Sequence, residues 1–410
     1  MAQPAQNLGG VRDDIIQNVV RETRACFNSK QPAFRFDKLL GSGAAGVLCR
    51  VVETATPPGR GGRRSDRAGL SRRLAVKRAI GAEAEEDLRS EVVVLKRLRG
   101  AEHIVRLIAF HDDRPQAPTF LNDSKRVLSS LWRATTGTPF LGQRSNSSAV
   151  YDSLLDGLRG PAVVMEYLEN GSLGALLEKL RATDILLPNR VLWSFCLCVV
   201  RACIAHAYPP EGDEDAPNQL ERIRRDRPPQ MLGHGDIHEN NSTSRAIFII
   251  RAPREPPHGT NFAEHNLVPA LKLIDFGRAQ ESERDFKRMV YDLWLEMLAL
   301  ITRKRSARLP KGMYYGVETH AVEIQHADAM GCPKGNGAAY PTLDDALRHF
   351  LACCTIVDRN RRPSLERMLA EARRGAAQPA EAYTPNEEYE SDAAIDRLLG
   401  RLLLDADMED

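Results

Sequence analysis

Alternating apolar and polar positions predict strands in the first part of the chain. Residues 34–40 alternate in this way and lead through a glycine-rich stretch at 41–48 into a second strand-like run at 49–52. Residues 74–77 and 163–168 add two short apolar runs of strand length. We therefore predict a small sheet whose first two strands are joined by a glycine turn, because glycine tolerates tight turns.

The second part of the chain places apolar residues at helical spacing. Residues 191–208 are apolar over several turns and predict a buried helix, and residues 290–301 predict a second one. Shorter helices are expected at 91–98 and directly after Ser172, which is a suitable N-terminal cap. The pattern indicates an α+β fold, with strands in the first part of the chain and helices in the second.

Polar segments interrupt this pattern. We expect an N-terminal extension over residues 1–33, in which an amphipathic stretch packs on the domain or stays loose. Residues 375–410 predict a linker and an acidic amphipathic tail, whose helix docks on its own domain or binds a protein partner. The inserts are a second place where a protein partner could bind. They cover residues 53–73, 111–160, 209–230 and 251–269.

Composition narrows the classes of partner. The 410 residues include 57 Lys and Arg against 55 Asp and Glu, so no global basic field favours nucleic acid or an anionic membrane. No apolar run of about 18 residues is present, and the first residues lack an apolar signal region. We expect an intracellular protein, cytoplasmic or nuclear, with no nucleic acid and no membrane among its partners.

The eight cysteines are scattered along the chain. None forms a C-x-x-C pair, and none has a histidine at the sequence spacing of a zinc site. We expect reduced thiols without disulfide or metal roles.

The chemistry centres on two segments, residues 234–241 and 271–277. Asp236 and Asn241 stand five positions apart, which lets one loop offer a base to a hydroxyl group and an amide oxygen to a metal. Asp275 follows an apolar strand and can supply an anionic metal ligand. These residues indicate phosphoryl transfer from a magnesium nucleotide.

Two earlier features fit the same chemistry. The glycine-rich turn would bring bare backbone N–H groups close to phosphates, and the strand that follows it excludes the helix expected in a dinucleotide-binding fold. Lys77 ends a short strand, and a carboxylate on a facing helix, Glu91, would fix its flexible stem for phosphate binding.

The order of these segments resembles that of the protein kinase superfamily over residues 34–374. The segments that carry the resemblance are 41–48, 74–77, Glu91, 103–107, 162–167, 234–241, 275–277 and 362–364. The inserts, together with HGDIHENN and KLIDFGRA, resemble divergent kinase-like proteins of filamentous fungi. The resemblance implies a bilobal fold, with a small antiparallel β lobe that carries one main helix at about 34–168 and a larger, mostly helical lobe at about 169–374.

The resemblance also implies roles for individual residues. Asp236 would be the catalytic base, Lys77 and Glu91 would complete the catalytic set, and Asn241 and Asp275 would hold Mg²⁺. The adenine and phosphates of ATP would contact Gly41, Ser42, Gly43, Gly46, Leu48, Ala75, Lys77, Met165, Glu166 and Leu168.

Several departures keep alternatives open. Gly235 replaces the arginine that pairs with a phosphorylated activation loop in most protein kinases, and only 17 positions separate Asp275 from Asp292, without A-P-E. His238 makes the catalytic loop similar to that of aminoglycoside and choline kinases. The first interpretation is a protein serine/threonine kinase, the second a kinase of small hydroxylated molecules, and the third a nucleotide-binding pseudokinase scaffold.

Overall fold

The structure, a computed structural model, describes residues 8–43, 46–54, 71–114, 154–211, 218–237, 248–250, 264–327, 332 and 335–404. Contacts divide it into two compact units. Unit 1 contains the described residues up to Arg89 together with 107–167, and unit 2 contains 90–106 and the described residues from Leu168 onwards. The structure is a mixed α+β fold, as the sequence pattern predicts.

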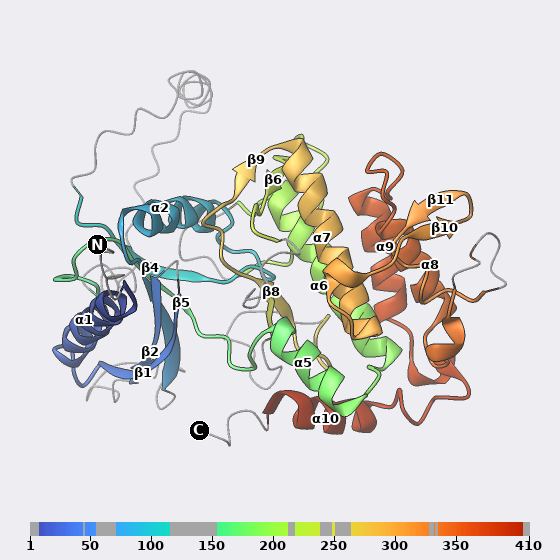
Figure 1. The fold of residues 1–410 in the computed structure, drawn as a ribbon, viewed down its shortest axis with the longest axis horizontal. Helices are drawn as coiled ribbons and strands as arrows, with labels where there is room; N and C mark the ends of the chain where they lie inside the picture. The colour runs from blue at the N-terminus through green and yellow to red at the C-terminus, as the bar shows by residue number, and fades with distance from the viewer. Residues whose placement is uncertain are drawn as a thin grey trace, which may run out of the picture. The chain divides into compact units, whose positions relative to one another are not determined.

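Unit 1 is built on a five-stranded antiparallel sheet with the order β1-β2-β3-β5-β4 (Figure 1). The strands are β1 (Phe34–Gly43), β2 (Gly46–Glu53), β3 (Arg72–Arg78), β4 (Leu107–His111) and β5 (Ala162–Glu166). A strand therefore follows the glycine turn, as predicted, where a dinucleotide-binding fold would have a helix.

Helix α1 (Leu8–Asn28) packs on β1 and β2 (Figure 1) and closes the core of unit 1. Val20 and Phe27 of this helix are buried against residues of all three central strands. The buried Arg78 on β3 ties the helix in place, because its guanidinium donates to Thr23 Oγ1 and to the carbonyl of Arg159. The N-terminal amphipathic stretch, which was expected either to pack on the domain or to stay loose, therefore packs.

Unit 2 contains most of the helices. They are the C-terminal part of α2 (Ala82–Arg97), α5 (Leu173–Thr183), α6 (Asn189–Ala207), α7 (Glu283–Thr302), α8 (Asp345–Cys354), α9 (Leu365–Ala376) and α10 (Asp392–Leu399). Ser172 Oγ accepts from the backbone N–H of Ala175 and caps α5, as predicted. Helix α7 begins well before residue 290 because Ser282 caps it, accepting from the N–H of Asp285.

Short strands and turns complete unit 2. The strands are β6 (Leu232–Gly233), β7 (Phe248–Ile250), β8 (Leu271–Leu273), β9 (Gln280–Glu281), β10 (Gly312–Tyr314) and β11 (Val317–Thr319). The short 3₁₀ turns are η1 (Ser306–Arg308), η2 (Gly337–Ala339) and η3 (Ala380–Tyr383), and η4 (Gly400–Leu404) is a π-helical turn that follows α10.

Helix α6 is the core of unit 2. It lies against α7, α9 and β8, and nearly all its residues are buried (Figure 1). Among the described residues it is the one helix long and apolar enough to cross a membrane, but 94% of its apolar window is buried inside the protein. The buried helix predicted at 191–208 is confirmed.

The chain after α9 docks on unit 2 through polar contacts. Lys179 Nζ on α5 donates to the carbonyl of Leu402 at 2.6 Å. The Glu390 carboxylate, with no exposed surface, accepts from the backbone N–H groups of Asn189 and Arg190 at 2.6 and 3.0 Å. It thereby caps α6, whose own N-cap residue, Pro188, offers no side-chain hydrogen bond. The apolar side of α10 is buried within this chain.

Candidate functional site

Two strand pairs of unit 2 bring the predicted catalytic segments together. Strand β6 pairs with β9, and β7 pairs with β8, both antiparallel. The segment after β6 holds Asp236, and the segment between β8 and β9 holds Asp275, so the pairing places these two segments side by side. His234 Nε2 donates to the carbonyl of Ile274 at 2.8 Å and joins them directly.

The residues around Asp275 are held in a defined conformation. Asp275 has a φ of 67°, in the left-handed region that few residues other than glycine adopt. The next residue, Phe276, is fully buried, and its backbone N–H donates to Glu91 Oε1 at 3.4 Å. Left-handed backbone of this kind tends to persist at functional sites, where the surrounding structure maintains it.

Two histidines pack on Phe276. The ring centroids of His234 and His206 lie 5.0 and 5.6 Å from that of Phe276. Burial, assisted by the neighbouring His234, lowers the pKa of His206 to about 3. His206 is therefore neutral near pH 7, and its Nδ1–H donates to the carbonyl of Leu232 at 2.9 Å. The rings of His206, His234 and Phe276 thus form a closely packed aromatic cluster beneath the segments that hold Asp236 and Asp275.

Gly235 is required by the approach of the two segments. Its φ is +79°, and a Cβ at this position would lie 1.9 Å from the carbonyl oxygen of Arg278. No side chain fits there without moving the backbone. A larger side chain such as that of arginine is therefore excluded at this position.

We expect Gly235→Ala to lower the free energy of unfolding by about 3 kcal/mol, since left-handed backbone strain and a backbone clash add together. The control is Gly316→Ala in the β10–β11 turn. Gly316 has a φ of +74° but nothing within 4 Å of a Cβ, so we expect a cost of about 1 kcal/mol. Urea unfolding of both variants measures the difference, and equal costs would show that the contact with Arg278 is unimportant.

Unit 1 places predicted nucleotide contacts on one face of its sheet. Leu48 lies opposite Lys77 in the β2–β3 register, and Ala75 lies opposite Met165 in the β3–β5 register. Because side chains alternate along a strand, these four residues share a face. The other face carries Cys49, Val76 and Val164 into the core with α1.

The glycine turn connects β1 and β2. Ser42 lies opposite Val47, and Gly43 lies opposite Gly46. Gly46 has a φ of +132°, and a Cβ would lie 2.0 Å from the carbonyl oxygen of Arg78, so only glycine fits. At Gly41, in contrast, a Cβ would have nothing within 4 Å. Of the three glycines of this turn, Gly41, Gly43 and Gly46, packing against β3 explains why Gly46 must be a glycine.

The remaining predicted site residues are distributed as follows. Glu166 ends β5 in unit 1, whereas Leu168 is a buried residue of unit 2. Lys77 belongs to unit 1 and Glu91 to unit 2, so their pairing stays a prediction. Asn241, the second predicted metal ligand, lies outside the described residues.

Arg362 is held by three backbone carbonyls and one aromatic ring. Its guanidinium donates to the carbonyls of Ile356, Val357 and Lys287 at 2.7 to 3.0 Å. The guanidinium also lies over the ring of Tyr291, with its central carbon, Cζ, 4.1 Å from the ring centroid. Arg362 thus joins the α8–α9 connection to α7.

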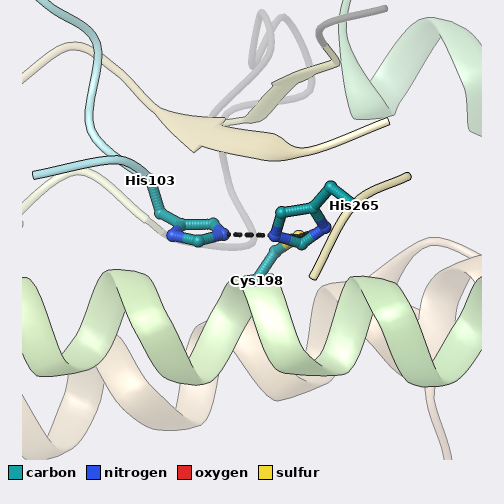
Figure 2. A group of neighbouring side chains, drawn as sticks. All are labelled: His103, Cys198 and His265. Carbon is teal, nitrogen blue, oxygen red and sulfur yellow. Dashed lines mark hydrogen bonds between the residues drawn. The ribbon is translucent and has the colours of Figure 1, made fainter. Parts of the chain in front are cut away.

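The sequence did not reveal one group of chemically active side chains in unit 2. All eight cysteines are free, as expected, but Cys198 lies in a fully buried cluster with His103 and His265 (Figure 2). The sequence offered no histidine near Cys198 at the spacing of a zinc motif, and the fold supplies two from distant segments. The spacing rule missed the cluster because His265 is 67 positions from Cys198 and 162 from His103.

The Glu221 carboxylate contacts this cluster through His103 and affects the pKa values of its members. Burial by itself lowers the pKa of His103, but the Glu221 carboxylate and the Cys198 sulfur together outweigh it and raise the pKa to about 10. Burial raises the pKa of Cys198, yet the two histidines outweigh it and lower the pKa to about 6. The polar members of the cluster stabilise one another in a site without exposed surface.

Comparison with known proteins adds no relative. No protein-family model matches the chain, and no curated protein matches it significantly. The functional argument therefore depends on the residues themselves.

Proposed function

We propose that this chain is an ATP-dependent phosphotransferase that uses Mg²⁺ and transfers phosphate to a hydroxyl group. The observation that supports the proposal best is the pairing of β6 with β9 and of β7 with β8, which places Asp236 and Asp275 on adjoining segments. One carboxylate for the acceptor and one for the metal, on neighbouring segments, is the arrangement that this reaction needs.

The residues fit the proposed groups in their chemistry. Carboxylate oxygens are preferred ligands of Mg²⁺, and Asp275 is held in a conformation that its neighbours must maintain. Leu48, Ala75 and Met165 provide an apolar face for an adenine ring, and Lys77 on the same face provides a cation for phosphate.

Within this proposal each residue has one role. Asp236 orients the acceptor hydroxyl and accepts its proton, while Asp275 and Asn241 hold the metal. Lys77 binds the nucleotide phosphates and is braced by Glu91. Bound Mg²⁺ would neutralise the charge on the phosphates. Unit 1 would then correspond to the small lobe, and unit 2 to the large lobe, of a bilobal protein-kinase-like fold.

A protein serine/threonine side chain is the first candidate acceptor. It is supported by the kinase order of the motifs, from the glycine-rich turn to Arg362, Pro363 and Ser364.

A small hydroxylated molecule is the second candidate acceptor, and one structural feature favours it. Strand β9 ends at Glu281 and α7 begins at Glu283, so a single residue joins them. This connection leaves no segment of the length with which protein kinases bind a peptide.

We expect the purified chain to transfer phosphate from Mg-ATP and Asp275→Asn to bind Mg-ATP at least about tenfold more weakly, since removing the charge weakens metal binding. Binding of metal-free ATP should change little. Calorimetry with and without Mg²⁺ measures the difference. Incubation with generic protein and with a panel of small alcohols and aminoglycosides identifies the acceptor.

Each outcome separates the alternatives. Transfer to protein supports the first acceptor, and transfer only to small molecules supports the second. Nucleotide binding without any transfer would make the chain a pseudokinase, and the absence of nucleotide binding would reject the proposal altogether.

A further inference from the structure

We propose that His103, Cys198 and His265 form a structural binding site for a transition metal, with zinc as the natural ion. The cluster lies wholly within unit 2 and uses none of the residues assigned to phosphate transfer. The proposal therefore goes beyond the proposed function and does not depend on it.

Three segments from distant parts of the sequence supply the ligand atoms. Cys198 projects from α6, His103 from the segment before β4, and His265 from the segment before β8 (Figure 2). Their nitrogen and sulfur atoms all lie within 4.8 Å of one another. The three side chains converge on one point.

The distances are near those of a tetrahedral zinc site. The two histidine Nε2 atoms are 2.9 Å apart, and Cys198 Sγ is 3.9 Å from either ring nitrogen of His265. Zinc bonds of ordinary length place ligand atoms about 3.3–3.6 Å apart. A small turn of the His265 ring would lengthen the first distance and shorten the second.

Hydrogen bonds orient the ligands from behind. Glu221 accepts from His103 Nδ1 at 2.8 Å and from the His103 backbone N–H at 2.7 Å. A carboxylate that binds the second nitrogen of a histidine directs the first nitrogen, here Nε2, toward a metal. The backbone N–H of Leu271 donates to Cys198 Sγ at 3.3 Å, so the sulfur serves as an acceptor. Both contacts are typical of the outer shell of a metal site.

A buried carboxylate gives a second indication of a missing partner. Glu102, next to His103, is 2% exposed, and its Oε1 has no hydrogen-bond partner in the described part of the chain. It is close enough to interact electrostatically with both histidines. A buried carboxylate oxygen without a partner is costly. Glu102 is not one of the residues whose ligand atoms converge, so it lies beside the site as a neighbouring acidic group.

The donor types select the ion. Two imidazoles and a thiolate suit zinc, a borderline-soft ion that prefers nitrogen and sulfur and takes four ligands in structural sites. Mg²⁺, required by the proposed reaction, prefers oxygen and would not compete here. The full burial of all three ligands indicates a structural rather than a catalytic ion.

The site would stabilise the strand that leads to Asp275. Strand β8 is already bound to the cluster, because the Leu273 N–H donates to the carbonyl of His103 at 2.8 Å. Leu273 O accepts from the N–H of Val105 at 3.0 Å. A metal that joins His103, Cys198 and His265 would thus connect β8 firmly to α6.

Elemental analysis of the full chain, purified without a histidine tag and without chelators, tests the proposal. We expect about one zinc per chain, retained after dialysis. Cys198→Ser should lose most of this zinc. Cys203→Ser is the matched control, because Cys203 is an equally buried cysteine of α6 outside the cluster and should keep the ion.

Spectroscopy on the wild-type chain covers the case in which Cys198→Ser does not fold. Replacing zinc by Co²⁺ should give thiolate-to-cobalt charge transfer and the visible bands of a tetrahedral site. We expect Glu221→Gln, which alters a positioning residue, to weaken zinc binding by about 10- to 100-fold in a chelator competition. Removal of zinc should lower the melting temperature by several degrees.

Three results would overturn the proposal. They are a wild-type chain that takes up no zinc on isolation or reconstitution, equal zinc in Cys198→Ser and Cys203→Ser, and a cobalt spectrum without thiolate charge transfer. An intense blue copper spectrum from the isolated protein would overturn the choice of zinc. Loss of phosphate transfer alone, with zinc retained, would affect only the proposed function.

Discussion

We expect Asp236→Ala to lower the rate of phosphate transfer by about 10²- to 10⁴-fold, the usual contribution of a positioned general base. The side chain would no longer orient the acceptor hydroxyl or accept its proton. Nucleotide affinity should change little, because Asp275 and Lys77 remain. Single-turnover transfer from labelled ATP, beside ATP binding by calorimetry, measures the two effects separately.

The control is Asp226→Ala. Asp226 forms a surface ion pair with Arg224 and belongs to the polar insert after α6, so we expect wild-type transfer. If Asp236→Ala transferred phosphate at the wild-type rate, Asp236 would not be the base. If both variants lost transfer equally, the effect would be on folding, which circular dichroism would show.

We expect Glu390→Ala to lower the free energy of unfolding by about 3 kcal/mol, as much as Gly235→Ala. The carboxylate is fully buried and accepts from the backbone N–H groups of Asn189 and Arg190 and from Asn189 Nδ2. Its removal leaves buried donors at the start of α6 without an acceptor, and each costs about 1–3 kcal/mol. Chemical unfolding followed by circular dichroism measures the loss.

Glu388→Ala provides the matched control, since Glu388 is an exposed residue of the same segment. A surface change of this kind should stay within about 0.5 kcal/mol. Equal stability of the Glu390 and Glu388 variants would contradict the capping role. Partial recovery in Glu390→Gln would show that shape contributes alongside charge.

Local pattern was sufficient to predict most elements. The helix at 189–207 follows from an apolar run, and the strand–glycine–strand unit follows from alternation on both sides of Gly46. The cap at Ser172 could also be predicted, because a cap depends on the next few residues only. These features depend on residues that are neighbours in the chain.

Contacts between distant residues could not be predicted in the same way. Nothing near Gly235 in the sequence shows that Arg278 approaches it, and nothing near Cys198 indicates His103 or His265. The docking of α1 depends on the buried Arg78, which reads as an ordinary strand-end charge in the sequence. Such contacts arise from the fold, and the polar residues that make them carry no periodic signal.

The capping of α6 by Glu390 affects the order of events during synthesis. The first turn of α6 receives its acceptor from a residue 201 positions further along the chain. The ribosome therefore produces the most apolar helix of unit 2 well before the carboxylate that completes it. Until α7 and α9 have also been made, the apolar surface of α6 would be exposed to other chains, and incomplete chains of this kind are prone to aggregate. Binding by chaperones during translation would then depend on residues 189–207 and end once α7 and α9 have packed on them, and the docking of residue 390 would complete the first turn of the helix.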